Sequence, residues 1–440
     1  MNIVDTRLPY LETALTRQTM RELVAEQVVP RLLPGRTLAK LSLQYSRYKA
    51  GKEHVALYQL ELDPEPDTAP PLLTVTFGQR GRLQRIHEQI SSGDAARARS
   101  ALLLAEQSCL AEIFPADFGL PLLWQAADAD RATELVGAML PDCRDVRIAR
   151  VDLLRYRPGR RCVLRYEIEH HGGRLVLVGK LYAEGKRATI VATKAQTLSG
   201  QAAATIKLAT PVGLAPSNGL LLMEHIDGDK LGDQLENSPS REINEQTVRT
   251  AAFALATFHR FRLETSESRS LRSEVDGLRA RLEPVHDVGT SLAHDIQALL
   301  AEIETHLAAL PPTTECVIHG EYKPNQLLLR NGQISVVDLD RSCIGDPAID
   351  VGNFCAVLEK EVFYEGHPHL AGLSDVFLSA YDTANHIDGI GRRAAIFRSL
   401  TFLRMLTRYF ERNPQGYARL GGEWRPLVFL AEARSSIDRL

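Results

Sequence analysis

The sequence predicts an α+β protein with a bilobal plan, in which a small antiparallel sheet module precedes a larger helical module. Polar and apolar residues alternate after the glycine in RYRPGRRCVLRYEIE (155–169), as is typical of a β-hairpin. Helical periodicity dominates residues 205–440, for example in TVRTAAFALATFHRF (247–261) and LAHDIQALLAEIETHLAAL (292–310). Two modules of this kind are expected to leave a cleft between them.

The same hairpin pattern occurs once before, in RYKAGKEHVALYQLE (47–61). It aligns with residues 155–169 at an offset of 108, and six of the fifteen positions are identical. Either two common hairpins resemble each other by chance, or the N-terminal part holds a degenerate copy of the sheet module, which we favour. The intervening residues 84–140 read as helical, including ARARSALLLAEQSCLAEIF. We therefore predict three modules: an N-terminal α/β cap (1–140), a sheet module (141–226) and a helical module (227–440).

Composition narrows the range of partners. A formal net charge of -3 gives no general attraction to nucleic acid or to anionic membranes. The eight arginines between residues 144 and 165 could form a solvated hairpin face, a triphosphate cradle or a nucleic-acid patch, and the scarcity of interleaved aromatic residues disfavours the last. We find no signal peptide and no membrane span, so we expect a cytoplasmic monomer or homodimer without a nucleic acid or membrane partner. The six cysteines are scattered, which favours small core residues over zinc ligands or disulfides.

The stretch VIHGEYKPNQLLLRNGQISVVDLD (317–340) carries the residue types that phosphoryl transfer requires. That reaction needs Mg²⁺ held against the phosphates of ATP, a cation on the phosphates that are not transferred, and a carboxylate that orients the acceptor hydroxyl. Asp338 ends an apolar strand, where a buried carboxylate would be costly without a cation, so we predict a metal ligand. Gln326 can add a neutral amide oxygen. Asp340 is either a further metal contact or an exposed partner of Arg341.

The other two requirements also have candidates. Glu321 is the carboxylate positioned to meet the acceptor hydroxyl, and Lys323 either touches the γ-phosphate or is solvated. Lys180 interrupts the apolar strand RLVLVGKLY and can reach the α and β phosphates. The turn of the second hairpin could bring backbone and guanidinium groups to the triphosphate through Arg157, Gly159 and Arg160.

Three motifs in this half of the chain resemble the aminoglycoside phosphotransferase and choline kinase branch of the protein-kinase-like fold. HGEYKPNQ (319–326) is similar to its H-G-D-x-x-x-x-N loop, VVDLD (336–340) to its I-D-F-D metal turn, and GDPAIDVGNF (345–354) to its G-D-P-x-x-D-L segment. The resemblance spans about residues 145–440 and implies an ATP- and Mg²⁺-dependent small-molecule kinase. LLLMEHIDGDKL (220–231) resembles the hinge that binds adenine, which implies roles for the backbone at Glu224 and Ile226.

Two positions depart from the family pattern, because Glu321 stands in place of Asp and Gln326 in place of Asn. Gln at the metal position resembles the maltokinases, which also begin with an N-terminal cap. Both changes lengthen a side chain by one methylene, so a matched shift of the loop could preserve the site. We favour an active enzyme. The alternative is a pseudokinase that binds nucleotide as a regulatory or interaction module.

The acceptor is expected to be a small-molecule hydroxyl on a sugar, aminosugar or amino-cyclitol. LEKEVFYEGHPH (358–369) offers three carboxylates for a cationic acceptor and two aromatic rings, Phe363 and Tyr364, for a sugar. A solvated helix face is the alternative. We expect His259 and His319 to be hydrogen-bonded core residues and Asp350 to brace the catalytic loop.

Overall fold

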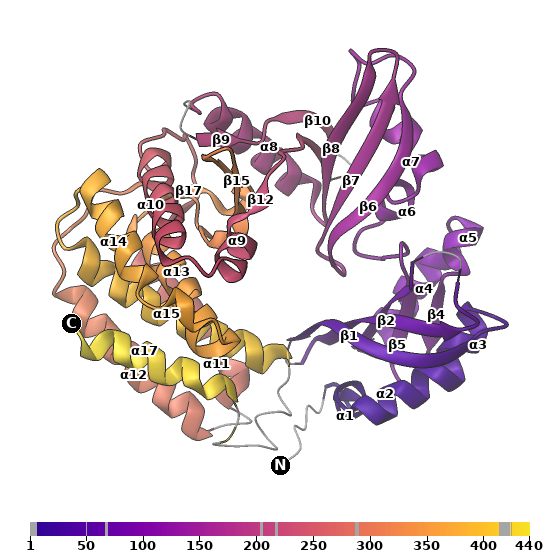
Figure 1. Cartoon of the computed structure of the whole chain (residues 1–440). Helices are drawn as coiled ribbons and strands as arrows, with labels where there is room; N and C mark the ends of the chain where they lie inside the picture. The colour runs from indigo at the N-terminus through magenta and orange to yellow at the C-terminus, as the bar shows by residue number, and fades with distance from the viewer. Residues whose placement is uncertain are drawn as a thin grey trace. The chain divides into compact units, whose positions relative to one another are not determined.

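The computed structural model describes residues 7–49, 51–66, 69–202, 206–215, 219–286, 290–412, 423 and 425–440 (Figure 1). The chain divides into two compact units. The N-terminal unit comprises residues 1–189, 212–223 and 409–421, and the C-terminal unit comprises residues 190–211, 224–408 and 422–440. The N-terminal unit therefore contains both the expected cap and most of the expected sheet module. Module boundaries at residues 140 and 226 stay predictions.

The N-terminal unit begins with short helices that precede a five-stranded sheet of order β1-β2-β3-β5-β4. The helices are α1 (Leu11–Leu15), α2 (Arg17–Leu23), the π-helical turn η1 (Val24–Val28) and α3 (Val29–Leu32). The sheet and its helices comprise β1 (Thr37–Lys49), β2 (Glu53–Asp63), β3 (Leu72–Gly78), α4 (Arg80–Ser91), α5 (Ala95–Ala98), β4 (Ala101–Leu104) and β5 (Cys109–Ile113).

The helical expectation for ARARSALLLAEQSCLAEIF was wrong over most of its length. Its two apolar runs form strands β4 and β5, which pair antiparallel, and β5 continues the ladder beside β3. Ser108 has a positive φ of 47° immediately before β5, a conformation that an α-helix does not contain. A short apolar run is compatible with the period of a helix or of a strand. Here the strand is favoured because β5 pairs with the edge of β3, which would otherwise be unpaired.

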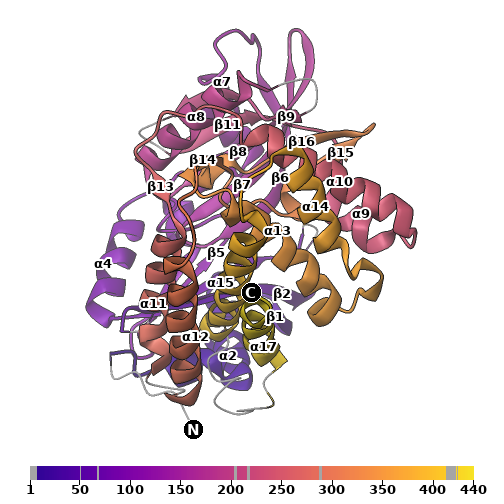
Figure 2. The same ribbon diagram turned by 90° about the vertical axis from the view of Figure 1, so that its left-hand side faces the viewer.

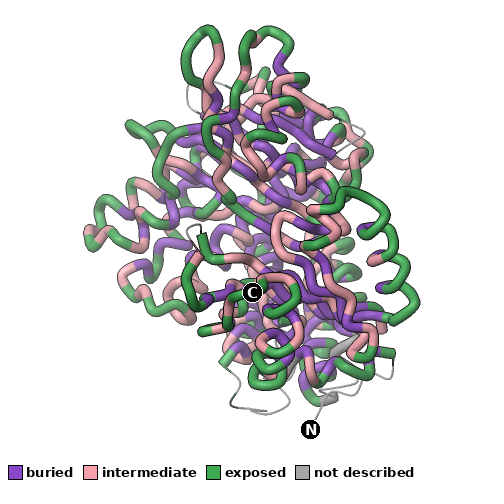
Figure 3. Tube along the Cα trace, turned by 90° about the vertical axis from the view of Figure 1, so that its right-hand side faces the viewer, coloured by how far each residue is buried: buried purple, intermediate pink, exposed green. Residues whose placement is uncertain are grey.

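A second five-stranded sheet in the same unit has the order β10-β11-β8-β7-β6. Its strands are β6 (Arg147–Arg157), β7 (Arg161–His170), β8 (Gly173–Tyr182), β10 (Pro211–Ala215) and β11 (Leu220–Glu224). The helices α6 (Leu123–Ala126) and α7 (Ala129–Gly137) precede β6, and α8 (Gly185–Ser199) follows β8 and lies mostly in the C-terminal unit. The predicted alternation on β7 is confirmed, because Cys162, Leu164, Tyr166 and Ile168 are buried while the residues between them are less so; Figure 3 shows the chain coloured by burial.

The two sheets share one topology. In each, the first three strands are neighbours, a helix follows the third strand, and the last strand of the sheet in sequence lies beside the third. The hairpin turns also match, since Gly51 and Gly159 have φ values of 64° and 65°. The repeat seen in the sequence is therefore confirmed, and it extends from one hairpin to a whole sheet.

The registers of the two sheets show which residues correspond. Val55 on β2 pairs with Thr76 on β3, whereas the equivalent Val163 on β7 pairs with Lys180 on β8. The position of Lys180 is thus held by a threonine in the first sheet. A β-branched threonine suits a strand but brings no cation.

The C-terminal unit is mainly helical, as predicted. Its main helices are α9 (Leu231–Asn237), α10 (Arg241–Phe258), α11 (Leu271–His286), α12 (Thr290–Ala308), α13 (Ala348–Lys360), α14 (Leu373–Ala384), α15 (Ile390–Arg412) and α17 (Val428–Asp438), where the end of α15 passes into the other unit. Figure 2 shows α11 beside α12 and α10 beside α14. None of the described helices is long and apolar enough to span a membrane.

Two small sheets in this unit position the segments that contain Glu321, Gln326 and Asp338. One has the order β12-β15-β16-β9 and the other β13-β17-β14. Their strands are β9 (Ile206–Leu208), β12 (Asp229–Lys230), β13 (Ser268–Arg269), β14 (Cys316–Ile318), β15 (Leu327–Arg330), β16 (Gln333–Val336) and β17 (Cys343–Gly345). Strands β15 and β16 pair as an antiparallel hairpin, with Leu327 opposite Val336. The residues just before β15 and just after β16 consequently meet at the same end of that hairpin.

Candidate active site

The buried carboxylate of Asp350, on the first turn of α13, holds the loop that follows β14. It accepts hydrogen bonds from the backbone N–H groups of His319 at 2.6 Å, Gly320 at 2.8 Å and Tyr322 at 3.3 Å. His259 contributes a fourth contact, with Nε2 3.3 Å from the same carboxylate. Asp350 therefore braces the loop that carries Glu321, as the sequence predicted.

His319 is also a structural residue. Its Nδ1 accepts a hydrogen bond from the backbone N–H of Glu321 at 3.3 Å, so Nε2 carries the proton and donates to the carbonyl oxygen of Val337 at 3.0 Å. The side chain is fully buried. It links the loop that carries Glu321 to the segment that carries Asp338, which fixes the spacing of the two.

Glu321 forms an ion pair with Lys323, with 3.0 Å between Oε1 and Nζ. The two side chains remain 26% and 22% exposed, so both can meet a ligand. Burial raises the pKa of Glu321, but Lys323, Arg341 and Arg408 together outweigh this effect and lower the pKa to about 2. The carboxylate is therefore ionised at neutral pH and is a weak base while Lys323 remains beside it.

Gln326 and Asp338 meet at the end of the β15–β16 hairpin. The amide nitrogen of Gln326 donates to Oδ2 of Asp338 at 3.1 Å, which leaves the amide oxygen as the atom that could ligate a cation. Asp338 has a left-handed backbone with φ of 66°, and Asp340 follows it, 6% exposed, in the 3₁₀ turn η3 (Leu339–Arg341). Two carboxylates and one amide oxygen are hard oxygen donors, and this set fits Mg²⁺.

The predicted nucleotide residues on the second sheet lie in the N-terminal unit. Lys180 is on β8 and half-buried, and the turn after β6 contains Arg157, Gly159 and Arg160. The backbone N–H of Gly159 already donates to the carboxylate of Asp117 at 2.8 Å. Any contact of this turn with a triphosphate would therefore have to come from the two arginines or from another amide.

The expected hinge has one backbone donor in use. The N–H of Glu224 donates to the carbonyl oxygen of Thr210 at 2.8 Å, and its side chain pairs with Lys207 at 2.7 Å. Ile226 is 8% exposed. The roles of the backbone at Glu224 and Ile226 in binding adenine stay predictions.

The sequence analysis missed a group of arginines around the catalytic loop. Glu274 on α11 accepts from Nε of Arg269 at 2.7 Å and from Arg404 on α15, and Nη1 of Arg269 donates to the carbonyl oxygen of Gly320 at 2.7 Å. The positive charges of Arg341 and Arg408 also lower the pKa of Glu321. These arginines come from three distant segments, so no local motif could have indicated them.

The carboxylates expected to receive a cationic acceptor are mostly paired within the chain. Glu359 pairs with Arg398 at 2.7 Å. Lys360 lies 3.1 Å from Glu361 and 2.5 Å from Glu365. Because each carboxylate already has a cation beside it, this segment offers less negative charge than its sequence suggests.

The same segment gives the expected aromatic rings other partners. Phe363 packs edge-on against Phe429 with ring centroids 5.6 Å apart, and Tyr364 lies 4.8 Å from the same ring. The guanidinium of Arg425 stands 4.3 Å over Tyr364. These neighbours occupy one side of each ring, so a sugar could not stack there.

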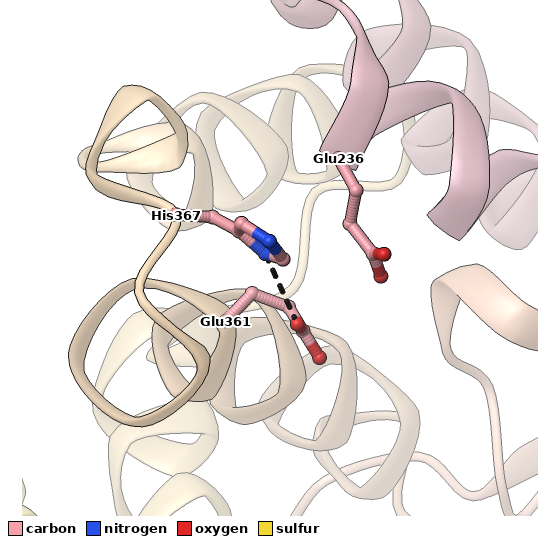
Figure 4. A group of neighbouring side chains, drawn as sticks. All are labelled: Glu236, Glu361 and His367. Atoms are coloured by element: carbon pink, nitrogen blue, oxygen red, sulfur yellow. Dashed lines mark ion pairs between the residues drawn. The ribbon is translucent and has the colours of Figure 1, made fainter.

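Glu236, Glu361 and His367 form a half-buried cluster in the C-terminal unit. Glu236 on α9 faces Glu361 and His367, and the three side chains converge in Figure 4, with Nδ1 of His367 3.4 Å from Glu361. Burial raises the pKa of Glu236, and the charge of Glu361 raises it further. A cationic group placed there would relieve this repulsion.

Comparisons with known proteins agree with this architecture. The model of the phosphotransferase enzyme family (APH) matches residues 163–394, more than half of the chain. A search of the curated proteins found no match.

Three solved structures share the fold. A protein of Ralstonia eutropha JMP134, provisionally assigned as an aminoglycoside phosphotransferase, superposes with a TM-score of 0.53 at 14% identity, covering 70% of this chain and 98% of its own. Choline kinase from Cryptosporidium parvum Iowa II gives 0.50 at 14%, covering 71% and 97%. Amicoumacin kinase hAmiN, solved with AMP-PNP, Ca²⁺ and Ami, gives 0.50 at 13%, covering 72% and 95%. The family match extends over the braced loop, the segment of Asp338 and Lys180, and the chain therefore belongs to the phosphotransferase enzyme family.

Proposed function

We propose that the chain transfers the γ-phosphoryl group of ATP to a hydroxyl of a sugar or aminosugar, with Glu321 as the residue that receives this hydroxyl. The ionisation, exposure and position of Glu321 support this proposal most. Its carboxylate is ionised, partly exposed and carried on a loop held by Asp350. An acceptor hydroxyl can donate a hydrogen bond to such a group and so be oriented for attack.

The reaction needs little covalent help from the chain. The acceptor oxygen forms a bond to the γ-phosphorus while the bond from phosphorus to the bridging oxygen breaks, and ADP leaves with that electron pair. The hydroxyl proton passes to Glu321 or to the new phosphate group. A carboxylate with a pKa of about 2 is a poor proton acceptor, so Glu321 acts mainly by orientation while Lys323 is beside it. We propose that Lys323 turns to the γ-phosphate when ATP binds, which would leave Glu321 to the acceptor.

The residues proposed to hold the metal ion are Asp338, Asp340 and the amide oxygen of Gln326. Mg²⁺ would neutralise charge on the phosphates of ATP there. Gln326 is longer than the Asn of the family pattern, yet it reaches Asp338. This contact supports the proposal that the longer side chain of Gln326 can still ligate the metal ion.

Substrate screening tests this proposal. Purified protein with Mg-ATP would be incubated with neutral hexoses, hexosamines, amino-cyclitols and sugar acids, and the products would be analysed by mass spectrometry for the addition of one phosphate group. We expect at least one acceptor to be phosphorylated by the wild type and not by Glu321→Gln. A protein that binds Mg-ATP but modifies no sugar-type hydroxyl would contradict the acceptor class.

A further inference from the structure

Lys194 on α8 is a buried lysine outside the set of residues proposed so far for the reaction. Its side chain is only 3% exposed. The ammonium group donates to the carboxylate of Glu267 and, at 2.6 Å, to the backbone carbonyl oxygen of Ser342. All three residues belong to the C-terminal unit. A buried cation is costly unless it is paired and hydrogen-bonded, and these two contacts meet that requirement.

Ser342 ends the segment that carries the proposed metal ligands Asp338 and Asp340. It directly follows η3, directly precedes β17 and is fully buried. Its N–H donates to the carbonyl oxygen of Leu339 at 3.1 Å, which closes the turn around Asp340. Its own carbonyl oxygen accepts from Lys194. This end of the segment is therefore held by a side chain of α8.

The other end of the same segment is held by the loop that carries Glu321. The N–H of Val337 donates to the carbonyl oxygen of Gln326 at 3.0 Å, and the carbonyl oxygen of Val337 accepts from Nε2 of His319 at 3.0 Å. Residues 337–342 are thus fixed at both ends, at the second by a lysine 148 positions earlier in the chain. Mg²⁺ demands near-ideal octahedral geometry, so a site for it depends on ligands that are held in place.

Glu267 connects the same lysine to β17. Its carboxylate pairs with Lys194, and its backbone carbonyl oxygen accepts from the N–H of Ile344 on β17 at 3.3 Å. Strand β17 pairs antiparallel with β14, which leads into the loop of Glu321. The ammonium group of Lys194 therefore lies where α8, the residue before β13 and the residue after η3 meet.

We propose that Lys194 is a positioning residue, which holds the carbonyl group of Ser342 and so keeps Asp338 and Asp340 in the geometry that binds Mg²⁺. This deepens the proposed function and rests on it. Replacing residues that orient metal ligands through hydrogen bonds typically weakens metal binding about 10- to 100-fold. Because Lys194 acts through the backbone of the segment and not on a ligand directly, we expect an effect at the lower end of this range.

The sign of the effect separates positioning from a general effect of charge. Removing a cation from the neighbourhood would by itself strengthen the binding of a metal ion, because like charges repel. Loss of positioning would weaken it. Lys194→Met deletes the ammonium group and keeps an apolar side chain of similar length, so the two explanations predict opposite changes in metal affinity for this variant.

Mn²⁺ is the probe, because it takes the same oxygen ligands as Mg²⁺ and the free ion can be measured by electron paramagnetic resonance. The nucleotide-free protein would be titrated with Mn²⁺, and thermal unfolding would report the stability of each variant separately. Asp338→Ala should abolish binding, which identifies the site. Lys194→Met should weaken binding about tenfold. Lys207→Met is the matched control, because Lys207 also pairs with a glutamate of the same unit, at 2.7 Å, and it should bind Mn²⁺ as the wild type does.

Unchanged or tighter Mn²⁺ binding in Lys194→Met would overturn the inference. A lower melting temperature would not rescue it, because that alone indicates a structural role. Lys194→Gln, whose shorter side chain ends in a neutral amide, carries the same expectation if Lys194→Met does not fold. Absence of binding in the wild type, or wild-type binding in Asp338→Ala, would instead contradict the metal ligands of the proposed function, so the two failures are distinguishable.

Discussion

The buried carboxylate of Asp117 accepts a hydrogen bond from the backbone N–H of Gly159, at 2.8 Å, and thereby ties the segment after β5 to the turn of the second hairpin. The same oxygen accepts from the hydroxyl of Tyr156 at 2.8 Å, and the other accepts from the N–H groups of Gly119 and Leu120. A Cβ at Gly119 would lie 2.5 Å from the Cα of Gly159. The segment that follows β5 therefore holds the turn of the β6–β7 hairpin by direct contact.

Removing this carboxylate should destabilise the N-terminal unit. Asp117→Ala leaves several buried donors without an acceptor, so we expect a loss of about 3 kcal/mol or more in the free energy of unfolding. Tyr156→Phe removes a single hydrogen bond and should cost about 1 kcal/mol. Thermal and urea unfolding would measure both. Equal melting temperatures for Asp117→Ala and the wild type would show that the carboxylate does not hold the turn.

Glu112 gives a pH-dependent prediction. Burial raises its pKa to about 8, and the neighbouring Asp117 adds to the effect. Between about pH 4.5 and pH 8 the folded state thus keeps a proton that the unfolded chain has released, so the free energy of unfolding must fall as the pH rises through this range. Glu112→Gln should flatten that slope and raise the melting temperature near pH 8. Glu61→Gln, at an exposed position on β2, is the control that should leave the slope unchanged.

Nucleotide binding should be visible as thermal stabilisation. Mg-ATP binds only the folded chain, so a hundredfold excess over its dissociation constant should add about 2.7 kcal/mol. Asp338→Ala should remove the dependence on Mg²⁺, because it deletes the proposed charged ligand. Differential scanning fluorimetry with ATP, with and without Mg²⁺, would check this. Absence of any shift for the wild type at millimolar Mg-ATP would count against both an active kinase and a nucleotide sensor.

The two sheets should differ in nucleotide binding. Thr76 occupies the position of Lys180 in the first sheet. Arg47→Ala and Lys52→Ala should therefore leave the affinity for ATP unchanged, although Arg47→Ala also breaks the contact with Glu53 and should lower stability. Lys180→Ala should weaken ATP binding. A loss of ATP affinity in either first-sheet variant would reverse the roles assigned to the two copies.

Glu321 can be tested through rate constants. Glu321→Ala should lower kcat by about 10² to 10⁴ while the affinity for ATP stays nearly constant. Glu321→Asp alone and Gln326→Asn alone should each impair the enzyme, and the double variant should recover part of the loss if the two longer side chains compensate through the position of the loop. Steady-state kinetics on a confirmed acceptor would decide, and a wild-type kcat for Glu321→Ala would exclude this residue as the catalytic carboxylate.

Local signals explain what the sequence predicted well. A glycine turn between alternating strands identified β6 and β7, and the same pattern at residues 47–61 identified the repeat. The spacing of the loop and the metal turn placed Gln326 near Asp338, because a short hairpin joins them. Each of these features depends on residues close together in the chain.

Features that depend on distant residues were not predictable in this way. Strands β4 and β5 were read as a helix because an apolar run has no clear period until a partner strand is known. The ion pair of Arg404 with Glu274 joins positions 130 residues apart, and the bond from Gly159 to Asp117 spans 42 residues. Neither contact leaves a motif, so both required the folded chain.

The repetition of one sheet topology has a consequence for the history of this enzyme. Two sheets with the same strand order, the same turn glycine and a matching register are what an internal duplication leaves behind. The family match begins at residue 163, within β7, so it covers part of the later copy and none of the earlier one. The earlier copy has threonine at the position of Lys180, so it would support the turn of the later sheet rather than bind ATP. Chains of this lineage should therefore diverge faster on the surface of the first sheet than at the positions where Asp117 and Gly119 meet the second.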